Sequence, residues 1–201
     1  MFEMQQQGPL YTAPALIVHQ TLTIFELAAT HDIFDQNGAR VGAVAEIGED
    51  RRKMFARFLL LRTDSAFTRE LEIRDEFGAR VLAVTRPRKM FKNTLIVHGP
   101  NGEFIGKAVQ EKVWGKKRFS FVTDEGQRVG GMDADGMIRI NAWSIRDETG
   151  NEVATFRSQF TMGRTRPLPE PLASMTLASA LTVDMVLGGK WLPAVTDLIP
   201  W

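Results

Sequence analysis

One pattern occurs five times along the chain: an apolar or β-branched segment, a turn with aspartate or asparagine and glycine, and a second such segment. A short hairpin loop needs a residue at positive φ, which glycine adopts without a Cβ clash. An aspartate at the start of the turn can accept a hydrogen bond from the backbone two residues further on. The turn glycines, at spacings of 40, 24, 24 and 24 residues, are Gly38, Gly78, Gly102, Gly126 and Gly150. The repeat predicts five antiparallel hairpins.

Alternation of apolar and polar residues on both sides of these turns predicts about twelve strands. Turns at intervals of roughly 8–12 residues, with no helical periodicity between them, are typical of a sandwich or a barrel. The repeats alone do not decide between these two folds. The expected strands are near 22–27, 31–35, 40–46, 54–61, 69–75, 79–85, 93–98, 103–109, 118–122, 127–132, 137–146 and 152–160.

The apolar segment Leu172–Leu187 decides between them. Pro171 suits the first position of a helix, and Gly188 and Gly189 form a stop after it. Asp184 is the only charge, and a helix that is apolar on all sides is buried on all sides. At about 1.5 Å per residue it spans about 24 Å, which is short for a bilayer but suits a barrel interior. We therefore expect a mainly β fold, a closed antiparallel barrel of about twelve strands around a central C-terminal hydrophobic helix.

The composition indicates one globular domain over residues 1–201, with a core over about 17–189 and a tail over 190–201. Hydrophobic residues make up 44% of the chain and the formal net charge is +1, so the charge balance alone indicates neither nucleic acid nor a membrane as a partner. The absence of cysteine excludes disulfides, thiol catalysis and S-acylation. The N-terminus lacks the pattern of a signal peptide, and no apolar run reaches the roughly 20 residues that span a bilayer. We expect a cytoplasmic protein, at most peripheral to a membrane.

Hairpins with the pattern F-x-[IV]-x-D-x-x-G-x-x-[IV], followed by an apolar helix with an aspartate in its last third, resemble the tubby-like superfamily. Within it, the phospholipid scramblase and LURP-one-related families are most similar. The resemblance covers roughly Leu22 to Leu187 and implies a barrel around a central helix. Eukaryotic scramblases also carry a proline-rich N-terminal region, a cysteine cluster and an acidic calcium segment before the helix. Here the corresponding segment, Gln159 to Glu170, is short, basic and proline-rich, so neither lipid transport nor calcium gating is expected.

The strongest functional signal is the stretch from Arg86 to Arg118, whose nine basic and two acidic residues give a net charge of +7 against −6 for the rest of the chain. Adjacent hairpins should bring these residues toward one region of the barrel. A group of about 4–8 Lys/Arg can bind anionic lipid headgroups, and Trp114 lies among them. The alternative is a solvated face without a ligand. The residues expected to bind lipid or anion are Arg86, Arg88, Lys89, Lys92, Lys112, Lys116, Lys117 and Arg118.

Other motifs indicate no catalytic or metal site. The segment Met132–Gly136 resembles a calcium loop but has its glycine in fourth place and no closing glutamate, so a hairpin turn at Asp135 and Gly136 is the better interpretation. The three histidines are scattered, and no nucleophile, zinc or phosphate-binding motif occurs. Asp184 is expected to bond a hydroxyl or an amide near the helix end. We expect no enzymatic activity, no cofactor and no metal.

Two hypotheses for the function remain open. The first is a tubby-like module that binds anionic phospholipid headgroups, or a membrane surface, through the basic barrel face. The alternative is a protein-interaction or structural domain with no lipid ligand, whose contacts would be made by edge strands and by the apolar tail Lys190–Trp201. Neither hypothesis includes a nucleic acid partner.

Overall fold

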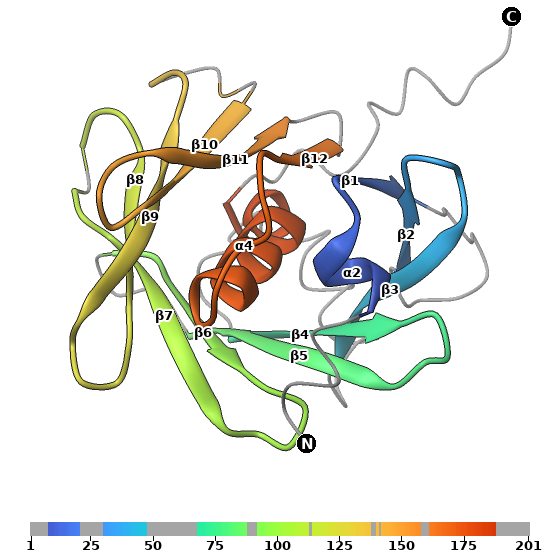
Figure 1. Ribbon diagram of the computed structural model, residues 1–201. Coiled ribbons are helices and arrows are strands. Elements are labelled where there is room, and N and C mark those ends of the chain that lie inside the picture. Colours follow the sequence, from blue (N-terminus) through green and yellow to red (C-terminus); the bar gives the residue numbers. More distant parts are fainter. Residues whose placement is uncertain are drawn as a thin grey trace, which may run out of the picture.

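The computed structural model describes residues 8–20, 30–47, 68–87, 92–112, 114–137, 140, 142–157 and 161–187. In this part of the chain, twelve antiparallel strands form a closed barrel in which each strand pairs with its neighbours in the sequence and the first strand pairs with the last (Figure 1). The predicted fold class is therefore confirmed. The strands are β1 (Ala15–Gln20), β2 (Thr30–Asp35), β3 (Arg40–Ile47), β4 (Arg69–Asp75), β5 (Arg80–Arg86), β6 (Thr94–His98), β7 (Phe104–Gln110), β8 (Arg118–Val122), β9 (Arg128–Ala134), β10 (Ala142–Asp147), β11 (Glu152–Arg157) and β12 (Thr161–Arg164).

The five predicted hairpin turns all form. In the first, the Asp35 backbone N–H donates to the Ala39 carbonyl at 2.9 Å, and the Asp35 carboxylate accepts from the N–H groups of Asn37 and Ala39. The turns that begin at Asp75 and Asp147 repeat these bonds. The turn glycines have φ between 78° and 89°, and a register shift follows each turn. This three-residue loop with a left-handed glycine explains why Asp and Gly recur at fixed positions.

Ten of the predicted strands correspond to β2–β11. β4 and β8 have the predicted bounds, whereas β10 begins at Ala142 rather than at residue 137. β1 and β12 were not predicted, because they pair with each other across the whole chain and no glycine turn joins them to a neighbour. The strands expected at 22–27 and 54–61 lie outside the described residues.

The helix α4 (Leu172–Leu187) lies inside the barrel, with strands around it (Figure 1). Nine consecutive residues, from Ser174 to Thr182, are each at most 2% exposed, so over more than two turns no side of the helix faces solvent. Glycine in the wall lets a strand approach it closely: a Cβ atom on Gly130 of β9 would lie 2.9 Å from Leu172 Cδ1. The predicted environment of the Asp184 side chain lies outside the described part of the structure.

A one-turn helix, α2 (Pro9–Thr12), packs beside α4 inside the ring of strands (Figure 1). Leu10 is 2% exposed and lies against the glycine backbone of Gly42 in β3. The Tyr11 hydroxyl forms a 3.0 Å hydrogen bond with Ser174 Oγ, and the guanidinium of Arg164 donates to backbone carbonyls of the α2 segment. The core therefore extends to Leu10, upstream of the expected start near residue 17.

The order of the strands places the connections alternately at the two ends of the barrel. One end, which we term the turn end, holds the five glycine turns, over 35–39, 75–79, 99–103, 123–127 and 147–151. At the opposite end, which we term the loop end, each odd-numbered strand from β1 to β11 ends and the even-numbered strand that follows it begins. Because β12 runs toward the turn end, α4 starts there and runs toward the loop end.

Candidate functional site

Four of the eight residues that were expected to bind lipid lie in the described connections of the loop end. Lys92 lies just before β6, and the other three lie between β7 and β8. Lys92, Lys112 and Lys116 are exposed, and Lys117 is half-buried. Lys92, Lys112, Lys116 and Lys117 are termed the lysine group below.

A buried pair of amide side chains holds the two lysine-bearing connections together. Asn93 Nδ2 donates to Gln110 Oε1 at 2.7 Å, and Gln110 Nε2 donates to the backbone carbonyl of Lys112 at 2.6 Å. The backbone N–H of Gln110 donates to the Asn93 carbonyl at 2.9 Å. Asn93 and Gln110 are 6% and 4% exposed, so water does not compete for these bonds. This Asn93–Gln110 clamp places Lys92 beside the segment that carries Lys112.

The connection between β7 and β8 is a short loop that is closed at its base. The Glu111 backbone N–H donates to the Arg118 carbonyl at 2.9 Å. Gly115 near the tip has φ of 93°, a conformation that side chains with a Cβ rarely adopt. The side chain before it, Trp114, is 88% exposed. A tryptophan this exposed gains nothing from the protein core, so the loop presents it to solvent or to a partner.

The other four predicted residues are not included in the lysine group. Arg86, at the end of β5, is 4% exposed and therefore does not form part of the outer surface. Arg118 begins β8, and its Nε donates to Asp133 Oδ1 at 2.5 Å. This hydrogen bond and the charge of Asp133 raise the pKa of Arg118. Arg88 and Lys89 lie outside the described residues.

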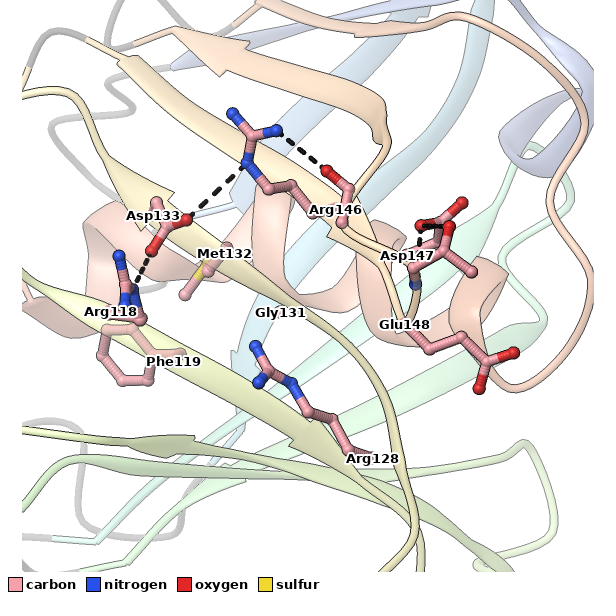
Figure 2. Close-up of a pocket in the computed structure, with 11 residues that line it drawn as sticks. Arg118, Phe119, Arg128, Gly131, Met132, Asp133, Arg146, Asp147 and Glu148 are labelled. Carbon is pink, nitrogen blue, oxygen red and sulfur yellow. Dashed lines mark hydrogen bonds and ion pairs between the residues drawn. The ribbon is translucent and has the colours of Figure 1, made fainter.

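A shallow depression of about 190 Å³ lies on the outer surface of β8, β9 and β10 (Figure 2). Asp133 bridges two of its arginines: Oδ1 lies 2.5 Å from Arg118 Nε and Oδ2 lies 3.7 Å from Arg146 Nε. Arg128 is the third lining arginine, and the acidic lining residues Asp133, Asp147 and Glu148 balance the three positive charges. The depression therefore lacks the net positive charge that would favour an anion. The segment Met132–Gly136 resembles a calcium loop in its sequence. In the structure its first three residues, Met132–Ala134, are the last three residues of β9.

One histidine, His31, is buried in the barrel interior, and Tyr11 and Arg164 are partly buried. Burial lowers the pKa of His31 to about 4 and raises that of Tyr11 to about 12. Burial also lowers the pKa of Arg164 to about 10. Tyr11 and Arg164 form the hydrogen bonds that hold the α2 segment against α4 and β12, which is a structural role.

The described part of the chain contains neither a metal-binding cluster nor a membrane-spanning helix. Among the described residues, no three His, Asp or Glu side chains gather in an arrangement that could hold a metal ion. No described helix is long and apolar enough to cross a membrane. The tail Lys190–Trp201, expected to make protein contacts, lies outside the described residues.

The acidic character of the turn end was not predicted from the sequence. The five turns contain eight acidic residues and no lysine, arginine or histidine; the acids are Asp35, Asp75, Glu76, Glu103, Asp124, Glu125, Asp147 and Glu148. Arginines that flank the turns are held by carboxylates of nearby strands, as in the 2.7 Å pair of Arg40 with Asp32. The acidic turns could have been assigned to one end from the sequence, because every second connection of an up-and-down antiparallel barrel lies at the same end.

The comparison with known families agrees with this architecture. A family model described as Scramblase matches residues 5–166, which include all twelve strands of the barrel. No curated protein matches the chain. The scramblase family is part of the tubby-like superfamily, so the expected resemblance is confirmed. The chain belongs to the Scramblase family.

Proposed function

We propose that the protein binds anionic phospholipids at a membrane surface through the lysine group. The observation that carries the proposal is the gathering of these four lysines at one end of the barrel by the Asn93–Gln110 clamp, opposite an end whose turns are acidic. A lysine near an anionic membrane contributes about 1 kcal/mol to binding. Membership of the Scramblase family supports a phospholipid surface, rather than another anion, as the partner.

The proposed role is peripheral binding, without catalysis and without lipid transport. The burial of α4 supports it, because the helix is the core of the barrel and its removal into a bilayer would expose the inner faces of the strands. The ion pairs in the depression support a non-catalytic role, since the charged side chains there neutralise one another. A cytoplasmic membrane surface is the proposed location.

The double variant Lys112→Gln/Lys116→Gln is expected to bind vesicles of phosphatidylcholine and phosphatidylglycerol about 30-fold more weakly than the wild type. Two lysines lost from the surface remove about 2 kcal/mol, which corresponds to that factor. Both side chains are exposed, so the fold should be unchanged. Co-sedimentation with vesicles at an ionic strength of about 0.1 M measures the effect. Wild-type binding should also weaken with salt, because the screening length falls from about 10 Å at 0.1 M to about 3 Å at 1 M.

The matched control is Gln36→Glu/Gln127→Glu, which changes the net charge by the same amount but at two exposed positions of the turn end. It should leave the affinity within about twofold of wild type, because charges more than a screening length from the membrane contribute little. Equal weakening by both double variants would show that binding follows net charge and not the lysine group. Wild-type binding to phosphatidylcholine vesicles as strong as to the anionic ones would contradict the proposed function itself.

A further inference from the structure

We propose that the barrel docks on an anionic bilayer end-on, with the loop end down and with Trp114 and Met137 inserted among the lipid headgroups. This inference rests on the proposed function and adds to it an orientation and two apolar contact residues. The alternative orientation is side-on, with the outer wall of β6 and β7 against the membrane.

Two loops at the loop end lie side by side and both present an apolar side chain. The backbone N–H of Ala134, at the end of β9, donates to the carbonyl of Lys117 at 3.0 Å. Trp114 lies three residues before Lys117, and Met137 lies three residues after Ala134. Trp114 is 88% and Met137 is 65% exposed. The second loop is also closed at its base, where the Asp135 N–H donates to the Ala142 carbonyl at 2.9 Å.

The chemistry of this end matches the boundary between water and lipid. Tryptophan is enriched at membrane interfaces, where its ring lies among headgroups and its N–H remains hydrated. Lysines beside an inserted side chain keep their ammonium groups at the anionic headgroups while their methylene chains contact apolar surface. Backbone hydrogen bonds already fix the bases of both loops before docking, which lowers the entropic cost of binding.

The opposite end argues for the same orientation. Its five turns carry eight acidic residues and no basic ones, so an anionic surface repels this end while it attracts the lysine group. The turn end also presents aromatic side chains, of which Phe77 is 87% exposed. Phe77 follows Asp75 and Glu76 directly in its turn, and these carboxylates disfavour its approach to anionic lipid. Phe77 is therefore a control for Trp114 that is matched in exposure and aromatic character.

The absence of cysteine from the sequence allows a direct test, since one introduced cysteine gives one labelling site. Full-length variants with Trp114→Cys, Met137→Cys, Ile96→Cys and Phe77→Cys are labelled with a polarity-sensitive fluorophore and mixed with phosphatidylcholine–phosphatidylglycerol vesicles. Ile96 is a half-buried residue of β6 and reports side-on contact. Labels at 114 and 137 are expected to shift their emission to shorter wavelength, whereas labels at 96 and 77 remain as in buffer. The unlabelled variant Trp114→Ala should bind about tenfold more weakly, and Phe77→Ala should bind like the wild type.

The outcomes separate this inference from the proposed function. If the protein binds anionic vesicles but the label at 96 shifts and that at 114 does not, docking is side-on and the inference is wrong, while the proposed function stands. An emission shift of the label at residue 77 would likewise show that the proposed end-on orientation is wrong. If neither the unlabelled wild type nor the labelled variants bind anionic vesicles, the proposed function is wrong, and the inference is wrong with it.

Discussion

Replacement of Leu177 by aspartate is expected to destabilise the protein by more than about 4 kcal/mol, a large share of the roughly 5–15 kcal/mol that stabilises a natural domain. Leu177 has no exposed surface and lies in the stretch of α4 that is buried on every side. Loss of a buried leucine side chain costs about 2–5 kcal/mol, and a carboxyl group without hydrogen-bond partners adds a further penalty. Urea denaturation followed by circular dichroism measures the change.

The control for this variant is Phe77→Asp, which also replaces a large apolar residue by aspartate. Phe77 is 87% exposed in a turn, so the free energy of unfolding should change by less than about 0.5 kcal/mol. If Leu177→Asp were as stable as Phe77→Asp, α4 would not be the core of the barrel.

Gly130→Ala is expected to lower the free energy of unfolding by about 1–3 kcal/mol, although alanine is ordinarily the better residue in a strand. An added Cβ would lie 2.5 Å from the backbone oxygen of Arg146 and 2.9 Å from Leu172 Cδ1. The backbone of the neighbouring strand and the side chain of Leu172 must both shift to accept the methyl group. Thermal and urea denaturation of the purified variant measure the loss.

Gly163→Ala is the matched control, since Gly163 is also a strand glycine, in β12, and an added Cβ there meets no atom within 4 Å. This variant should be as stable as the wild type or more stable by up to about 1 kcal/mol, because alanine restricts the unfolded chain. Equal stability of Gly130→Ala and Gly163→Ala would show that β9 does not approach α4 closely at Gly130.

Local chemistry explains which parts of the fold could be predicted. The turn that begins at Asp35 needs only an aspartate and a left-handed glycine at the right spacing, so each hairpin is encoded within a few residues. β1 and β12 close the barrel by pairing Ala15 with Gly163. No short-range signal encodes a contact between residues so far apart, so neither strand could be found from local pattern.

The same distinction between local and long-range signals applies to the candidate site. The basic stretch was visible in the sequence, but the alternation of residues along a strand decides which side chains reach the surface. Arg86 is buried at the end of β5, and Arg118 pairs across to Asp133 on β9. The proximity of Lys92 and Lys112 depends on the buried Asn93–Gln110 clamp, two amides whose pairing requires the three-dimensional structure.

Hydrogen exchange of the α4 backbone, measured on the protein in buffer and on the protein bound to phosphatidylglycerol-containing vesicles, tests the central claim most directly. That claim is that the helix is the core of the barrel and that membrane contact occurs outside it. Amides between Ser174 and Thr182 should be as strongly protected in the bound protein as in buffer, because every one of these residues is buried. Protection should increase only in loop-end segments such as the one that carries Trp114. Rapid exchange of the α4 amides in buffer, or release of the helix from the barrel on binding, would contradict the account.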